Sequence, residues 1–155
     1  MSNDKEFGAK ITCYASEAGM QVEETQRHKD GVPIAATVTI EMWPVMNRSP
    51  DMKRKISIQL SQDELPIYAA VLLGYLPRCQ FKRPDKGIFI ERQKARIYYK
   101  GTAGMGNLFQ VPVPIGTTFN MSQLVLKQLT AGLETSSSEF VLAGIKGSSA
   151  LYLQD

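Results

Sequence analysis

Residues 56–76 read "ISIQLSQDELPIYAAVLLGYL". Ile56, Ile58 and Leu60 alternate with polar residues, which is the period of a strand with one buried face. After Leu60 the apolar residues adopt helical spacing. Gly74 together with Pro77 is a stop signal for a helix. The stretch therefore predicts a strand that runs directly into a helix.

Polar and apolar residues at this joint have the spacing of a helix start. Ser61 and Glu64 are placed as a capping box, while Leu60 and Leu65 are placed as a hydrophobic staple. Asp63 is the alternative capping residue. A helix is expected to begin at this point.

A second joint of the same kind lies in residues 109–133, "FQVPVPIGTTFNMSQLVLKQLTAGL". A strand is predicted from Phe109 to Ile115, and its two prolines mark it as an edge strand or a solvent-facing one. The residues that take the places of staple, cap, box partner and staple are Phe119, Asn120, Gln123 and Leu124. The second helix is expected to end at Gly132.

Further strands are expected before each joint. In the first half they are 11–16, 20–26 and 35–43, with turns at Gly19 and 29–31; in the second half they are 79–83, 87–92 and 95–100. A short last strand is predicted over residues 140–145. The sequence thus predicts an α+β fold of two strand-strand-strand-strand-helix halves, about 9–77 and 78–146, in a single domain over 1–155.

Composition sets the class of protein. Hydrophobic residues make up 43% and charged residues 21% of the 155 residues, which are ordinary values for a globular domain. The longest nearly uncharged stretch, 65–76, is shorter than the roughly 20 residues that span a bilayer, so no membrane partner is expected. The N-terminus lacks an apolar secretion signal, and Cys13 and Cys79 are too few for a disulfide framework. We therefore expect a cytoplasmic protein.

Positive charge is concentrated in one segment. Residues 78–100 contain eight basic and two acidic residues, a balance of +6, whereas the whole chain is only +3. Focused positive charge of this kind is typical of a polyanion-binding surface.

The layout resembles the Whirly family and the related fold of the transcriptional coactivator positive cofactor four. The resemblance is carried by "KRKISIQLSQDELPIYAAVL", residues 53–72, and a lysine-glycine turn motif of the family has a partial echo in "YYKGTAGMGN", residues 98–107. Whirly proteins hold two such units in one chain and bind single-stranded nucleic acid. We expect a role in DNA replication, recombination, transfer or transcription.

Basic and aromatic residues fall on one face of the predicted strands. At strand period Arg96, Tyr98 and Lys100 share a face, and Phe89 lies opposite Ile88 and Ile90 on its strand. Basic side chains for phosphates and flat rings for bases are what single-strand binding requires. The candidate binding residues are Lys82, Arg83, Lys86, Phe89, Arg92, Lys94, Arg96, Tyr98 and Lys100, with Trp43, Lys53, Arg54 and Lys55 as an extension of the groove.

The main hypothesis is a single-stranded DNA-binding protein of low sequence specificity. RNA binding on the same surface and a non-enzymatic protein-interaction module are the alternatives. No catalytic cluster, metal site or cofactor motif is predicted, since the single histidine, His28, lies in a polar run without ligand spacing. Apolar residues spread around both helices, such as Ile67 and Leu126, favour a homo-oligomer, with a tetramer as the expected state.

Overall fold

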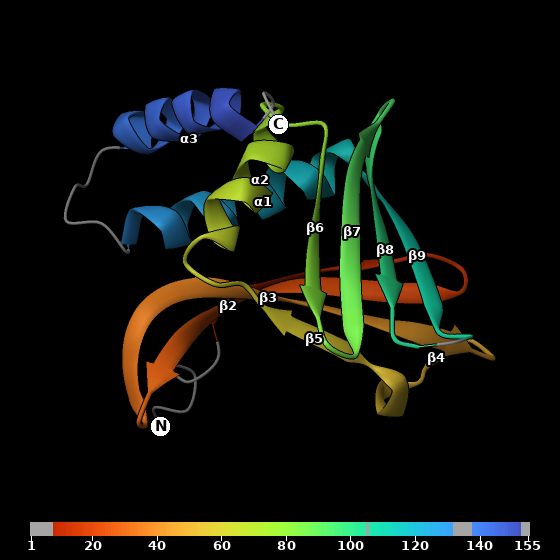
Figure 1. Ribbon diagram of the computed structural model, residues 1–155. Helices are drawn as coiled ribbons and strands as arrows, with labels where there is room; N and C mark the ends of the chain where they lie inside the picture. The colour runs from red at the N-terminus through yellow and green to blue at the C-terminus, as the bar shows by residue number, and fades with distance from the viewer. Residues whose placement is uncertain (1–7, 105, 132–137, 153–155) are drawn as a thin grey trace.

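The computed structural model describes residues 8–104, 106–131 and 138–152 (Figure 1). Its first sheet is antiparallel and contains, in spatial order, β1 (Lys10–Tyr14), β2 (Ala18–Lys29), β3 (Val32–Met46) and β5 (Ile56–Gln59). The two-residue strand β4 (Ser49–Pro50) pairs with the far end of β3, and a 3₁₀ helix, η2 (Met52–Arg54), precedes β5. Helix α1 (Glu64–Leu73) follows the sheet.

The second sheet is also antiparallel and keeps the order of the sequence. Its strands are β6 (Arg78–Arg83), β7 (Lys86–Gln93), β8 (Arg96–Thr102) and β9 (Leu108–Pro114). Helices α2 (Ile115–Ala131) and α3 (Ser138–Tyr152) complete the described chain. The predicted α+β class with two strand-strand-strand-strand-helix halves is confirmed, whereas an internal duplication in one domain stays a prediction.

The core lies between the two sheets and beneath the helices. In Figure 1 strands β6 to β9 stand across the long strands β2 and β3, and the three helices lie together on one side. Side chains of the longer strands of both sheets are buried in this space, among them Met20, Ile40, Ile58, Ile88, Ile90 and Val111. Because strand side chains alternate, the opposite faces of both sheets point outward.

The first joint forms as the sequence predicts. The Ser61 amide donates to Glu64 Oε1 at 3.0 Å, and the Glu64 amide donates to Ser61 Oγ at 3.2 Å, which completes a capping box. The Asp63 side chain makes no capping hydrogen bond, so Ser61 is the cap. Gly74 ends the helix with φ of 90°, a left-handed conformation that glycine adopts without strain.

The second helix begins earlier than predicted. Helix α2 already begins at Ile115, directly after the last residue of β9, so Asn120 and Gln123 lie inside the helix and do not cap it. Phe119 is 60% exposed and makes no staple. The stretch Gly116-Thr117-Thr118 is poor in helix formers, but burial of Met121 and Val125 outweighs this weak local preference. Gly132 lies outside the described residues.

The strand predicted over 140–145 is wrong, because these residues belong to helix α3. The buried residues of α3 are Val141, Ile145 and Ser149, which recur every four positions as helical packing requires. Phe140 next to Val141 suggested a strand by composition alone. Within the described chain, no helix is both long enough and apolar enough to cross a membrane.

The turn predicted at Gly19 is also wrong. Gly19 lies inside β2, opposite Tyr14 on one side and Trp43 on the other. A Cβ atom at this position would lie 2.5 Å from Nε1 of Trp43, so the glycine makes room for the indole. The predicted turn at 29–31 is present, because Asp30 and Gly31 take positive φ values of 53° and 79° and connect β2 to β3.

Candidate nucleic-acid interface

The outward face of the second sheet is built by strict alternation. On β8, Arg96, Tyr98 and Lys100 point outward, while Ile97 and Tyr99 are buried. The register places Phe89 beside Lys100 and Glu91 beside Tyr98. We call this surface the outer face, and it consists of Arg78, Gln80, Lys82, Phe89, Glu91, Gln93, Arg96, Tyr98, Lys100, Leu108, Gln110 and Pro112.

Charge on the outer face is mainly positive. Four of its residues are basic (Arg78, Lys82, Arg96 and Lys100) and one, Glu91, is acidic. Arg78 stands directly across from Glu91, and Gln93 connects Glu91 to Arg96 through hydrogen bonds of 3.4 and 3.0 Å. These contacts orient Arg96 without neutralising the sheet, so a positive potential remains over β8.

Two aromatic rings lie among these charges. The Lys100 ammonium is 5.3 Å from the centre of the Phe89 ring, a cation-π contact that covers part of that ring. Tyr98 is half-buried, and partial burial together with the nearby Glu91 carboxylate raises the pKa of its phenol. Tyr98 therefore stays neutral at physiological pH and offers an uncharged ring and a hydroxyl hydrogen-bonding group.

A groove of 660 Å³ runs beside Tyr98. One wall comes from the outer face, through Arg96, Tyr98 and Gln110 among others, and the other is the β1–β2 turn from Ala15 to Ala18. This turn reaches the second sheet because β2 packs across β9. The groove thus places the Tyr98 ring and the Arg96 guanidinium in one concave surface, with the Glu17 carboxylate on the opposite wall. The ring suits an unstacked base and the guanidinium its phosphate.

A second cavity, of 340 Å³, collects basic residues from distant parts of the chain. We call it the basic pocket; its lining is Lys53, Arg54, Lys55, Ile56, Asp85, Lys86, Ala103 and Asn107. Segment 53–56, the β6–β7 turn and the β8–β9 hairpin each contribute one side. The Arg54 guanidinium donates to Oδ1 of Asn107, and the Lys55 ammonium is 3.2 Å from Glu41 Oε2.

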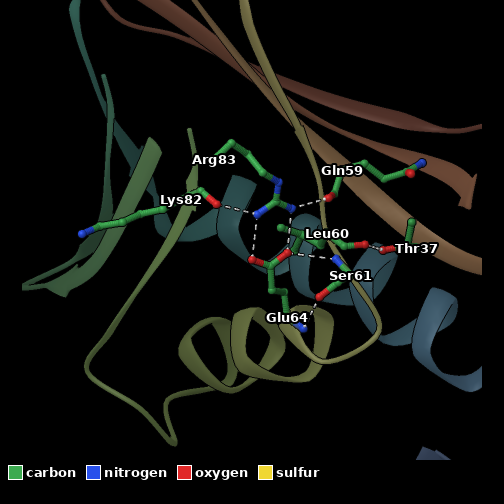
Figure 2. A network of polar contacts seen from close by, with 7 residues as sticks. All are labelled: Thr37, Gln59, Leu60, Ser61, Glu64, Lys82 and Arg83. Atoms are coloured by element: carbon green, nitrogen blue, oxygen red, sulfur yellow. Dashed lines mark hydrogen bonds and ion pairs between the residues drawn. The ribbon is translucent and has the colours of Figure 1, made fainter. Parts of the chain in front are cut away.

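Two predicted basic residues serve the fold instead of the outer face. Arg83 binds both carboxylate oxygens of Glu64 at 3.0 and 2.8 Å and also donates to the Gln59 and Lys82 carbonyls (Figure 2). The Glu64 carboxylate raises the pKa of the Arg83 guanidinium. Arg92 donates to the carbonyls of Val71 and Leu72, two of the last residues of α1. The guanidinium groups of Arg83 and Arg92 therefore donate to groups within the protein.

Trp43 lies on the predicted side of β3, opposite Ile40 and Met42, but it is only 2% exposed. Tyr14 packs against it edge to face with the ring centres 5.9 Å apart. This ring is covered and is not available for stacking. Lys94 lies exposed in the β7–β8 turn, beyond the sheet.

Sequence reasoning did not identify the β1–β2 turn as a wall of the groove. Residues 15–18 are about eighty positions from Gln93 and Arg96 in the chain, and no local pattern signals that contact. The outward position of Gln110 could have been predicted, because Gln110 alternates with the buried Phe109 and Val111 along the strand. Tyr14, 61% exposed and adjacent to the turn, is a further ring near this site.

Comparisons with known proteins support the fold. No protein-family model and no curated protein matches the sequence. Among solved structures, the chain matches one described as "Crystal structures of trypanosoma bruciei MRP1/MRP2", with a TM-score of 0.58 and 12% identity over 81% of this chain and 94% of that chain. The likeness confirms the Whirly-like fold. At this identity it shows the fold alone.

Proposed function

We propose that this protein binds single-stranded nucleic acid with little sequence preference, without catalysing a reaction. The observation that carries the proposal is the outer face, where four basic residues and two rings stand on one exposed sheet beside a groove. Basic side chains track the phosphates, and each stacked base contributes about 1 to 3 kcal/mol. The Whirly-like fold is consistent with this use.

Single-stranded DNA and RNA both fit the outer face, because phosphates and base rings are common to the two polymers. The roles in DNA replication, recombination, transfer or transcription therefore depend on which polymer is preferred. Competition between matched deoxy- and ribo-oligonucleotides decides this. A cytoplasmic location is part of the same proposal.

Fluorescence anisotropy of labelled oligo-dT and oligo-U, at two salt concentrations and with duplex competitor, tests the proposal. We expect binding that weakens with salt and survives the duplex. Arg96→Gln and Tyr98→Ala should weaken it. Lys146→Gln is the matched charge control, because it lies on helix α3, which is away from strand β8 (Figure 1). Absence of binding at low salt would favour the protein-interaction module instead.

We also propose that the protein is a homo-oligomer, with a tetramer as the expected state. The three helices lie together on one side of the molecule (Figure 1), and Phe140 and Leu151 of α3 are 72% and 69% exposed. Large exposed apolar side chains on one side are typical of subunit contacts. Light scattering should give a multiple of 17.2 kDa, and a monomer at all concentrations would refute this part.

A further inference from the structure

The basic pocket is more highly charged than an internal phosphate requires. Its four basic residues are opposed in the lining by Asp85, and Lys55 is additionally paired with Glu41. Among the described residues, the ion pairs involve Lys55, Arg83 and Lys127, so Lys53, Arg54 and Lys86 have no carboxylate partner. Three cations without a close carboxylate partner thus border one small cavity, whose lining contains one opposing carboxylate, Asp85.

The cavity is held open by contacts within the protein. The Asp51 side chain accepts from the Lys53 amide at 3.2 Å and fixes the start of η2. Arg54 binds the Asn107 amide oxygen, and Asn107 Nδ2 donates to the Ala103 carbonyl at 2.9 Å, so η2 is tied to the β8–β9 hairpin. A cavity that is formed before binding loses little conformational entropy when a ligand enters.

The β8–β9 hairpin contributes to both the basic pocket and the groove of the outer face. Asn107 lines the pocket and the next residue, Leu108, lines the groove. Lys86 of the pocket and Gln93 of the groove lie at opposite ends of β7, about 23 Å apart at about 3.3 Å per residue. A single strand of several nucleotides that follows the outer face from the groove to the hairpin can therefore place its end in the pocket.

We propose that the basic pocket binds the terminal phosphate monoester of a single strand that lies in the groove. An internal diester carries one negative charge, whereas a terminal monoester carries close to two at neutral pH and offers three acceptor oxygens. The ammonium groups of Lys53 and Lys86 and the Arg54 guanidinium supply matching donors on different sides. This inference rests on the proposed function and specifies which part of the strand the pocket recognises.

The test compares short oligo-dT, of about eight nucleotides, with a hydroxyl or a phosphate at the 5′ end and separately at the 3′ end. We expect one phosphorylated end to bind about tenfold more tightly, the effect of one or two charge-assisted hydrogen bonds. The preference should vanish in the Lys53→Gln/Lys86→Gln double variant, weaken in each single variant, and persist in Lys146→Gln, which removes one charge from the exposed surface of α3. Inorganic phosphate should reduce the tighter affinity to that of the hydroxyl oligonucleotide.

Different results separate the inference from the proposed function. Equal affinity for hydroxyl and phosphate ends, with binding intact, overturns the terminal site and leaves single-strand binding standing. A preference that survives the double variant places the recognition elsewhere and also overturns it. If inorganic phosphate weakens both oligonucleotides to the same extent, the effect is ionic screening and not competition at the pocket. If the protein without substitutions binds no oligonucleotide, both proposals are refuted.

Discussion

The contact between Gly19 and Trp43 shows how one missing side chain shapes the first sheet. Trp43 is the single tryptophan of the chain, and its indole lies over Gly19 with Nε1 buried and without a hydrogen-bond partner in the described structure. An added methyl group would meet Cε2 at 2.7 Å as well as Nε1 at 2.5 Å. A rigid ring cannot yield locally, so it must move as a whole.

Gly19→Ala is therefore expected to destabilise the protein by about 2 kcal/mol, within the range for overpacked sites. The displaced indole should also become more exposed, which red-shifts its fluorescence. Urea unfolding followed by tryptophan emission measures both effects. An unchanged emission spectrum in the folded variant would show that the indole had not moved.

Gly101→Ala is the matched control for this substitution. Its added methyl would meet Ile56 Cδ1 at 2.8 Å and Met42 Sδ at 2.9 Å, across the space between the two sheets. Both atoms belong to flexible side chains that can change rotamer. We expect a smaller loss of about 1 kcal/mol or less and no change in emission wavelength.

Glu64 connects the capping box to the second sheet, and this makes its contribution depend on pH. The hydrogen bond from Arg83 is the main cause that lowers the pKa of the Glu64 carboxyl below its usual 4.5. A lowered pKa in the folded state stabilises the fold above pH 4.5, and this stabilisation is lost as the pH falls through the folded pKa. The ion pair is partly exposed, so its contribution is modest.

Glu64→Gln keeps an acceptor for the Ser61 amide but removes the charge that Arg83 binds. We expect a loss of about 1 to 2 kcal/mol in the free energy of unfolding at pH 7 and little difference from the original protein at pH 3. Urea titrations at the two pH values measure this. Asp63→Asn removes the neighbouring carboxylate, which makes no capping bond, and serves as the control. A loss that is equal at both pH values would exclude the charge as its origin.

At the scale of elements, strands such as β5 and β8 could be predicted because one face of each is buried. Period-two alternation in Ile56 to Leu60 and in Arg96 to Lys100 identifies both strand and orientation. The start of α1 could be predicted from the capping box of Ser61 and Glu64, which are close together in the sequence. The start of α2 escaped prediction because it depends on tertiary burial of Met121 and Val125, which a local pattern does not encode.

Helix α3 presents two faces with different roles. Ile145 is 5% exposed and packs beside Pro66 and Ile67 of α1, whereas Phe140 is 72% exposed. Ile145→Ala should cost about 2 to 4 kcal/mol of stability, since it leaves a cavity in the helix layer. Phe140→Ser should change the unfolding free energy of the dissociated chain by less than about 0.5 kcal/mol.

Chemical denaturation with light scattering separates the two variants of α3. If Phe140 contributes to a subunit contact, Phe140→Ser lowers the mass in solution while secondary structure remains. Ile145→Ala should instead lower the unfolding free energy of each chain, because it weakens the packing within the chain. A strong destabilisation by Phe140→Ser at concentrations where the protein is a monomer would contradict this assignment.

At the scale of the molecule, the candidate site combines what sequence can and cannot reveal. Strand parity alone places Arg96, Tyr98 and Lys100 together on one face. The engagement of Arg83 and Arg92 with α1 depends on how a helix lies over a sheet, and the basic pocket depends on three segments that meet only in the folded chain. Charge density along the sequence therefore predicted a polyanion surface, but not which cations remain available to it.

Those available cations and the ring of Tyr98 should contribute to affinity in separable ways. For single strands, the slope of log K against log salt concentration falls by about 0.7 for every phosphate that a protein neutralises. Lys82→Gln removes one exposed cation of the outer face and should reduce the magnitude of the slope by about 0.7. Tyr98→Ala removes a stacking ring without changing charge, so it should weaken binding by about 1 to 3 kcal/mol and leave the slope unchanged.

Anisotropy titrations of labelled oligo-dT at several salt concentrations measure both quantities in one experiment. Lys146→Gln controls for a loss of net charge away from the outer face. Because salt screens charges that lie far apart, this variant should change the slope and the affinity only slightly. If Lys82→Gln and Lys146→Gln reduce the slope equally, nucleic acid responds to net charge and not to this surface. If Tyr98→Ala changes the slope, its ring acts by positioning phosphate contacts, since stacking itself releases no counterions.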